Sequence, residues 1–348
     1  MRAVIKEEAG EGYVMREHVT TPEPEGDEVL IRVERVSICG SDIALYKWNE
    51  VARVIATVPF IPGHEAVGTV VKCGPQAALT IGQQIGVENH FYCGKCYCCE
   101  HERGDICQNM GQYGHGKKTT HGGFSQYSVL SSKYCFPLTR NITLDEAVLL
   151  EPCGVAHNAI EQLEIQGEDV LIIGCGPIGL LGCAVSKAMG ARRVISADID
   201  QSRLDLSKTM GSDLVVNTSR EDLKEVIMRE TQQNGIGRIC EMSGAASMVN
   251  NMFSLLRKGG HVVMVGLPKT PLHVENPLPD IVFKSLTLKT VHGRRIFHTW
   301  LECERLIAEK KIDVLPVISH QLSMTQWETA FEALFSGSAC KIILNPMK

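Results

Sequence analysis

Four cysteines lie close together in one short polar stretch of the chain. Cys93, Cys96, Cys99 and Cys107 are separated by two, two and seven residues, and the residues between them cannot form a hydrophobic core of their own. Thiolates at this spacing are typical of a loop that folds around one zinc ion with tetrahedral geometry. Four thiolates leave no open position on the metal, so we expect a structural zinc site, with Cys98 as a spectator.

Length and charge narrow the class of protein. At 348 residues the chain exceeds what one hydrophobic core usually serves, so we expect two domains. An apolar fraction of 44% supplies enough material for packed interiors. A net charge of -5 without a dense basic run argues against a nucleic-acid partner. The longest apolar runs have the length of strands and are too short to span a bilayer, so we expect no membrane partner.

The number of cysteines helps to predict the cellular compartment of the protein. There are fourteen cysteines, and the first residues lack the long apolar stretch of a secretory signal. In a long chain of this kind, reduced thiols are favoured over disulfides, and we therefore expect a cytoplasmic protein. Six of the cysteines are interpreted as small buried hydrophobic residues: Cys73, Cys135, Cys183, Cys240, Cys303 and Cys340.

The first part of the chain reads as strands and loops. Runs rich in β-branched residues predict strands at 28–33 and 65–71. Prolines interrupt helical patterns nearby, at Pro22, Pro24, Pro62 and Pro75.

From about Leu144 the pattern changes to strands that alternate with amphipathic helices. The predicted strands cover 169–173, 193–197, 214–216, 238–242 and 261–265. Helices are predicted from the turn at 174–179 to about Gly190, at 201–210 and at 220–232. This alternation indicates an α/β fold with parallel βαβ units and helices on both faces of the sheet.

The end of the chain is expected to return to the first domain. After about Lys289 the sequence predicts a helix at 297–309 and a short closing strand at 341–344. The predicted domains are therefore 1–147 together with 290–348, and 148–289.

A glycine-rich turn follows the first strand of the alternating region and opens a helix. Its residues are Gly174, Cys175, Gly176, Pro177, Ile178 and Gly179. The first glycine allows a tight turn, the second lets a pyrophosphate approach the backbone, and the third permits close packing of helix and strand. The N-terminus of the helix supplies unpaired N–H donors for the phosphates. The pattern predicts a dinucleotide site, and by itself it suits FAD as well as NAD.

An acidic residue ends the next predicted strand. Asp198 lies 19 residues beyond Gly179, where a carboxylate can accept hydrogen bonds from the ribose hydroxyls of adenosine. It would also repel a 2′-phosphate, so NAD is favoured over NADP. Arg203 is a candidate for contact with the adenine, although a solvent-exposed position on a helix explains it equally well.

A second set of possible metal ligands has a different composition. Cys39, the pair His64 and Glu65, and Glu151 are each unremarkable alone, since a single cysteine is usually buried and a His-Glu pair often ends a strand. A catalytic zinc needs fewer protein ligands than a structural one and an open position. Combined with a nucleotide site and a zinc loop, these residues become candidates for a catalytic metal site.

The order of these motifs resembles that of the zinc-dependent medium-chain dehydrogenases over essentially the whole chain. The matching residues lie at 39–42, 63–65, in the four-cysteine lobe, at 151–152 and at 174–179. Within that family the sequence is similar to L-threonine 3-dehydrogenases and to polyol and amino-cyclitol dehydrogenases. Trp48-Asn49-Glu50, His90 and the segment 293–300 resemble the threonine enzymes most.

The resemblance implies a fold and a set of roles. The fold would be a GroES-like β-rich catalytic domain, with a structural zinc lobe at about 90–110, joined to a Rossmann domain, with the site between them. Cys39, His64 and Glu65 would bind the catalytic zinc, and Glu151 would be an exchangeable fourth ligand or the partner of a bound water. The family also implies NAD as the hydride acceptor and a homo-oligomer, either a tetramer or a dimer.

Two further residues receive roles from the resemblance. Ser41 stands where the family has its proton-relay hydroxyl, and His90 would line the pocket of a small polar alcohol substrate. The relay histidine of the threonine enzymes is replaced by Ala44, so the proton would leave by way of the nicotinamide ribose or water. A missing relay group typically costs about 10²-fold in rate unless another group substitutes for it.

The sequence leaves three functions open. The leading hypothesis is oxidation of L-threonine or a similar amino alcohol. Ser41, Ala44 and Asn158 favour the alternative, a dehydrogenase of a polyol, sugar alcohol or cyclitol. A non-catalytic NAD-binding sensor is the third, suggested only by the missing relay histidine. His157, beside Asn158, is interpreted as a buried histidine without a chemical role.

Overall fold

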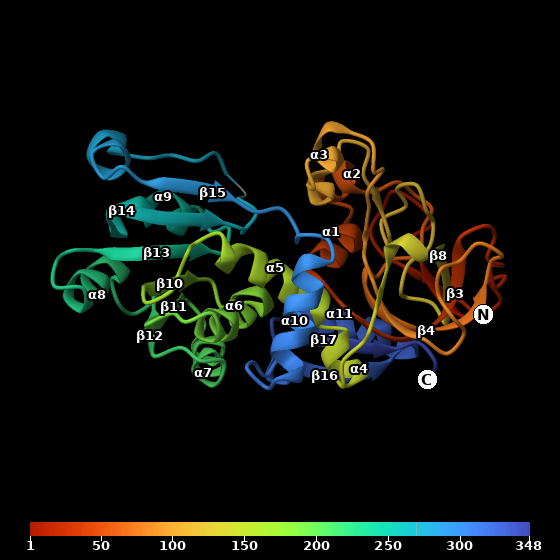
Figure 1. Cartoon of the computed structure of the whole chain (residues 1–348). Helices are drawn as coiled ribbons and strands as arrows, with labels where there is room; N and C mark the ends of the chain where they lie inside the picture. Colours follow the sequence, from red (N-terminus) through yellow and green to blue (C-terminus); the bar gives the residue numbers. More distant parts are fainter. Residues whose placement is uncertain (269) are drawn as a thin grey trace. The chain divides into compact units, whose positions relative to one another are not determined.

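The computed structural model describes residues 1–268 and 270–348, and the chain divides into two compact units (Figure 1). Unit 1 comprises Met1–Glu151, Arg295–Ala308 and Ile318–Lys348. Unit 2 comprises Pro152–Arg294 and Glu309–Val317. Each unit has a hydrophobic core of its own.

The main sheet of unit 1 has seven strands and is mostly antiparallel. The strands lie in the order β16 (Ile318–Ser323), β17 (Lys341–Asn345), β3 (Glu28–Ser37), β4 (Glu65–Cys73), β5 (Gln84–Val87) and β9 (Cys135–Pro137), and β8 (Tyr127–Ser131) also pairs with β3. Two small sheets pair β1 (Ala3–Ile5) with β2 (Val14–Arg16) and β6 (His90–Phe91) with β7 (Gly111–Gln112). The end of β3 at Ser37 pairs with β17 on one side and with Glu65, the start of β4, on the other, so the last strand of the chain lies one strand away from Glu65.

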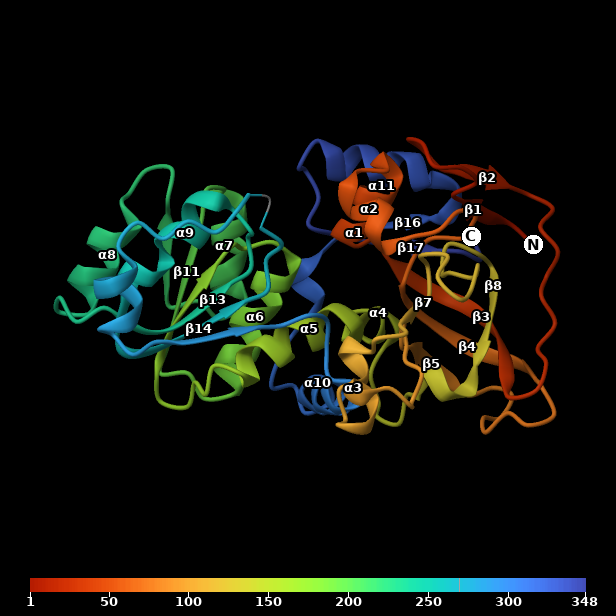
Figure 2. The same cartoon turned by 90° about the horizontal axis from the view of Figure 1, so that it is seen from above.

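Unit 1 also contains helices. They are α1 (Gly40–Lys47), α2 (Glu50–Ile55), α3 (Tyr97–Glu100), α4 (Leu144–Ala147), α10 (His298–Ala308) and α11 (Trp327–Phe335). α11 lies beside β16 (Figure 2). The expectation of strands and loops alone in the first part was incomplete, because α1 and α2 lie there. Both helices are short and are specified by capping more than by apolar periodicity: the side chain of Asn49, for example, accepts the backbone N–H of Ala52.

The sheet of unit 2 has six strands, all parallel. Their order is β12 (Leu214–Asn217), β11 (Arg193–Asp198), β10 (Asp169–Ile173), β13 (Ile236–Glu241), β14 (Leu256–Met264) and β15 (Thr287–Thr290). The helices are α5 (Leu150–Glu161), which begins in unit 1, and α6 (Pro177–Ala188), α7 (Gln201–Thr209), α8 (Leu223–Glu230) and α9 (Ala246–Leu255). α6 packs against α7, and α8 packs against α9. The predicted α/β fold with a parallel sheet is confirmed.

The elements of unit 2 that were not predicted include α9 and β15. α9 contains the pair Asn250-Asn251, which has low helix propensity, and β15 has no continuous apolar run. The predicted helix at 220–232 is shorter, because Asp222 caps the helix and accepts the N–H of Glu225 at 2.9 Å. Across the described ranges, no helix combines the length and apolar content needed to cross a bilayer.

Candidate active site

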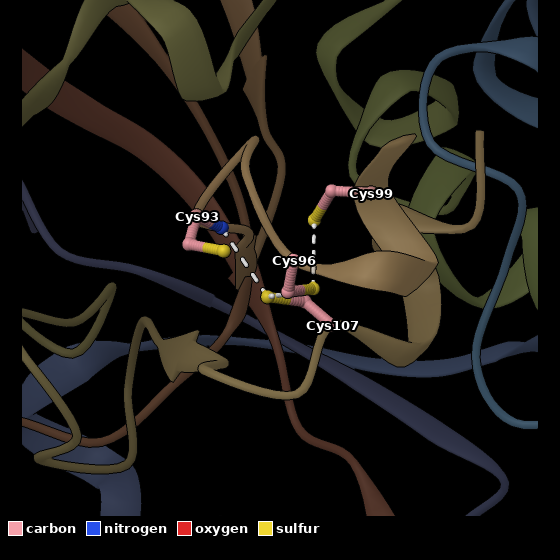
Figure 3. Close-up of side chains that lie close together, drawn as sticks. All are labelled: Cys93, Cys96, Cys99 and Cys107. Carbon is pink, nitrogen blue, oxygen red and sulfur yellow. Dashed lines mark hydrogen bonds between the residues drawn. The ribbon is translucent and has the colours of Figure 1, made fainter. Parts of the chain in front are cut away.

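The four predicted cysteine ligands come together (Figure 3). Their sulfur atoms all lie within 4.8 Å of one another, and Cys96 Sγ lies 3.5 Å from Cys99 Sγ and 3.8 Å from Cys107 Sγ. Four sulfurs that bind one zinc at about 2.3 Å stand about 3.8 Å apart in a tetrahedron, so this group has the size that the ion requires. Cys93 completes the group, and Cys98 is not part of it. No disulfide joins any of these four cysteines.

A second group of possible ligands consists of Cys39, His64 and Glu65, whose ligand atoms also lie within 4.8 Å of one another. Cys39 caps the N-terminus of α1, and Glu65 begins β4. Asp42, fully buried in the first turn of α1, accepts the N–H of Cys39 at 2.9 Å and that of Gly63 at 3.3 Å. One carboxylate therefore holds together the two segments that carry the ligands.

The electrostatics of this group suit a cation. His64 is buried, and its Nδ1 lies 3.8 Å from Oδ1 of Asp42. Burial by itself would lower the pKa of His64, but the negative charges of Asp42 and Cys39 outweigh it and raise that pKa well above its ordinary value. Because Nδ1 faces Asp42, Nε2 is the nitrogen suited to a metal, an arrangement common among zinc-binding histidines. A thiolate, an imidazole and a carboxylate fit a catalytic zinc ion.

Glu65 has a buried cationic partner that no sequence pattern predicted. Lys341, in β17, is 2% exposed, and its Nζ donates to both carboxylate oxygens of Glu65, at 2.9 and 2.7 Å. Burial opposes the charge of Lys341, but Glu65 and Cys39 raise the pKa of the lysine above its ordinary value. The hydroxyl of Ser37 donates to the same carboxylate. Glu65 therefore faces the ligand group, and its carboxylate is held in place by Lys341 of β17 and Ser37 of β3.

The other predicted residues of this region are placed as follows. Glu151 is buried in α5 and is not part of the Cys39 group; its Oε1 accepts a hydrogen bond from Asn89 Nδ2 at 3.0 Å. Ser41 is half-buried in the first turn of α1, and Ala44 follows one turn later on the same helix. His90 is buried in β6.

A further histidine lies against the ligand group, and the sequence analysis did not identify it as a candidate. His115 is buried, and its ring centroid lies 4.9 Å from that of His64. Its Nδ1 lies 3.0 Å from the carbonyl oxygen of Tyr113. Burial, and then the charge of His64, lower the pKa of His115 to about 3, so this ring is neutral. Its position in a glycine-rich loop gave no pattern that points to the metal group.

The glycine-rich turn of unit 2 joins β10 to α6. Each of its three glycines is favoured at its position for a different structural reason. Gly174 has a φ of +94°, and a Cβ there would lie 2.8 Å from Cβ of Ser243. A Cβ on Gly179 would collide with the carbonyl oxygen of Gly174. Nothing lies within 4 Å of the Cβ position of Gly176, so a phosphate can approach the backbone there. Pro177 and Ile178 form the first turn of α6.

Asp198 lies at the end of β11, beside this turn. Its Oδ2 accepts the N–H of Cys175 at 2.6 Å, and its Oδ1 accepts that of Asp200 at 2.9 Å. The carboxylate therefore fixes the glycine-rich turn. Arg203 lies in α7, where its backbone N–H bonds to Asp200 at 3.3 Å and its side chain is half-buried.

A four-thiolate group, a Cys-His-Glu group and a dinucleotide-type turn on a parallel sheet together define a zinc-dependent dehydrogenase. Two family models match the chain: an alcohol dehydrogenase GroES-like domain over residues 25–140 and a zinc-binding dehydrogenase over residues 177–309. The chain belongs to the zinc-dependent medium-chain dehydrogenases. The predicted class, an NAD-dependent zinc alcohol dehydrogenase that acts on CH–OH groups, is confirmed.

Individual relatives carry more specific names. The chain is 36% identical over 327 residues to an L-threonine 3-dehydrogenase of Coxiella burnetii. The aligned region covers 93% of this chain and 94% of the relative. It is 36% identical to the L-threonine 3-dehydrogenase of Deinococcus radiodurans, over 99% of this chain and 98% of that one. Among solved structures, L-idonate 5-dehydrogenase from Escherichia coli is similar, with a TM-score of 0.87, 26% identity, and coverage of 99% and 97%.

Proposed function

We propose that this protein is an NAD-dependent dehydrogenase that oxidises the secondary hydroxyl of L-threonine or a similar small amino alcohol. The observation that carries the proposal is the 36% identity to L-threonine 3-dehydrogenases over nearly the full length of both chains. The Cys39 group, with its capacity for one metal ion, supports the same chemistry.

Each implied ion has its own residues. Cys93, Cys96, Cys99 and Cys107 hold a structural zinc ion. Cys39, His64 and Glu65 would hold the catalytic one, and Glu151 would be an exchangeable fourth ligand or the partner of a bound water. The side chain of Glu151 is oriented by Asn89, whose Nδ2 donates to it at 3.0 Å. When bound, the catalytic zinc ion supplies Lewis-acid polarisation of the substrate hydroxyl, and NAD accepts the hydride.

The chain itself must carry away the hydroxyl proton. Ser41 Oγ, in the first turn of α1 next to Cys39, accepts this proton and passes its own outward. Ala44, one helical turn further, has no group that can take the proton on. The next acceptor is therefore a water molecule or a hydroxyl of the cofactor ribose.

The cofactor is held by the turn between β10 and α6. Gly174, Gly176 and Gly179 shape this turn, and Pro177 with Ile178 places the N-terminus of α6 toward the pyrophosphate. Asp198 would accept hydrogen bonds from the ribose hydroxyls and disfavour NADP through its charge. Arg203 would lie along the adenine.

A polyol, sugar alcohol or cyclitol is the alternative substrate. Ser41, Ala44 and Asn158 favour it. Asn158 is buried, and its Nδ2 donates to the carbonyl oxygen of Gly293 at 3.1 Å, so a structural role explains it too.

A substrate panel tests the proposal. NADH formation is measured on metal-analysed protein with L-threonine, sorbitol, ribitol, inositols and butanediol, with NAD and NADP compared. Activity with L-threonine and NAD is expected. Turnover of the polyols without turnover of threonine would establish the alternative, and no turnover of any alcohol by fully zinc-loaded protein would favour a non-catalytic sensor.

The assembly and the compartment complete the proposal. Unit 2 exposes large apolar side chains at Leu278, Val282 and Phe283 and on its edge strand β15 at Leu288, with exposures from 48% to 66%. Such a surface supports a homo-oligomer, a dimer or a tetramer. The described cysteines form no disulfide, which fits a reducing compartment, the cytoplasm.

A further inference from the structure

A fully buried carboxylate near the ligand group has no role in the account so far. Glu88 directly follows β5, and its Oε1 accepts the backbone N–H of His90 at 2.9 Å. The same oxygen lies 3.2 Å from Nδ1 of the His90 ring. The other oxygen, Oε2, accepts the indole N–H of Trp300 at 2.8 Å, although Trp300 is 212 residues further along the chain. One carboxylate thus connects His90 to Trp300.

Trp300 is itself held in one position. It lies in α10, is 1% exposed, and stacks on Phe136 with ring centroids 5.3 Å apart and an interplanar angle of 28°. Its six-membered ring covers Gly86 of β5 so closely that a Cβ at this position would collide with it. The indole can therefore occupy this place only because residue 86 is glycine, and its N–H is directed at Glu88.

The segment that carries Glu88 borders the candidate metal group. Asn89 donates to Glu151 at 3.0 Å. His90 pairs with Gln112 across β6 and β7, and the carbonyl oxygen of Asn89 accepts the N–H of Tyr113 at 3.1 Å. Two residues further along, the ring centroid of His115 lies 4.9 Å from that of His64. The strand that carries His90 is thus paired with the segment that leads to the ligand group.

We propose that Glu88 is a positioning residue for substrate recognition, which fixes the His90 ring and is itself fixed by Trp300. A carboxylate 3.2 Å from Nδ1 favours the ring orientation and the tautomer in which Nδ1 carries a proton. Nε2 then becomes the nitrogen that the ring turns to the substrate. The inference rests on the proposed function and on the place in the substrate pocket that the family resemblance implies for His90.

Through these contacts the segment at 293–300 can influence which substrate the site accepts. That segment is the part of the sequence that most resembles the threonine enzymes, and Trp300 is its last residue. Trp300 acts on the substrate site through Glu88 and His90, and it needs no contact with the substrate.

The test uses two variants and one matched control. Glu88→Gln keeps the shape and removes the charge that lies 3.2 Å from Nδ1, so the KM for the substrate should rise severalfold, up to about tenfold. The kcat should change less, while the zinc content and the KM for NAD stay unchanged. Trp300→Phe keeps an aromatic ring over Gly86 but lacks the N–H donor, so the same KM should rise by a smaller factor. Trp327→Phe removes an equivalent indole, 7% exposed, from the aromatic cluster of α11, and should leave the KM unchanged.

The outcomes separate this inference from the proposed function. If the wild-type protein oxidises polyols and not threonine, the proposed function fails, and the Glu88 variants are measured with the polyol, where a selective rise in KM still supports the inference. An unchanged KM in Glu88→Gln, or an equal KM change in Trp300→Phe and Trp327→Phe, would overturn it. If Glu88→Gln does not fold, the comparison of the two tryptophan variants decides.

Discussion

The two metal groups of unit 1 are built in different ways. The four-cysteine group comes from one continuous stretch of the chain, Cys93 to Cys107, and its sulfur atoms are brought together by a short helix and turns (Figure 3). The Cys39 group combines the start of a helix with the start of a strand. It is held by a network of buried charges: Asp42 lies against His64, and Lys341 pairs with Glu65.

The difference follows from what each ion has to do. A structural zinc needs only four ligands in a closed shell, which a local loop can provide. A catalytic zinc needs an open position and ligands whose orientation is fixed from outside the first coordination shell, so distant parts of the chain take part. We therefore expect changes at the two groups to have different consequences, one for stability and the other for activity.

The largest contrast is expected between Cys39→Ser and Cys96→Ser. Cys39→Ser should remove the catalytic zinc and reduce NADH formation to background, because the thiolate ligand is lost, while the thermal midpoint changes little. Cys96→Ser should lower the thermal midpoint strongly, because binding of a structural zinc contributes directly to folding. Zinc analysis, kcat and thermal unfolding of both variants measure the contrast.

The same pair of variants can also contradict the assignment. Each should lose one zinc ion relative to wild type, so zinc content serves as the internal control. Full activity in Cys39→Ser, or an unchanged thermal midpoint in Cys96→Ser together with wild-type zinc content, would show that the groups are wrongly assigned.

A smaller effect is expected at the buried pair of Lys341 and Glu65. Lys341→Met keeps the length of the side chain and removes its charge, which leaves Glu65 buried with only the hydroxyl of Ser37 and the metal to compensate it. Removing one partner of a buried pair typically costs about 3–5 kcal/mol. Urea unfolding of metal-loaded protein measures the loss.

An exposed pair provides the control for Lys341. Lys72 pairs with Glu23 on the surface, where both side chains are more than half exposed. Lys72→Met should therefore change the free energy of unfolding by less than about 1 kcal/mol. Equal effects of the two substitutions would mean that Glu65 does not depend on Lys341.

Local patterns made the fold class and the four-cysteine group predictable. The strand and helix alternation after Leu144 gave the parallel sheet, because each element carries its own periodicity. The spacing of the four cysteines gave their cluster, because the ligands are neighbours in sequence. Cys39, His64 and Glu65 became candidates only in combination with other motifs.

The partners of the second group could not be predicted from local patterns. Lys341 is 276 residues from Glu65, and the closing strand that carries it reads as an ordinary apolar strand. Trp300 and Glu88 are similarly distant. Such pairs depend on the pairing of β17 with β3 and on the packing of α10, which no short pattern records. α1 and α2 were missed because capping residues, more than apolar periodicity, define them.

The smallest effect is expected at Asp42, which lies behind His64 and does not belong to the ligand group. Asp42→Asn keeps the size of the side chain but removes the charge that faces Nδ1, and partners of this kind typically change metal affinity by about 10–100-fold. A chelator should then remove the catalytic zinc from the variant at a lower concentration than from wild type, while the structural zinc stays. Asp105→Asn is the matched control, since Asp105 is equally buried but pairs with Arg103 beside the other metal group. If both variants lose the catalytic zinc at the same chelator concentration as wild type, Asp42 does not orient His64.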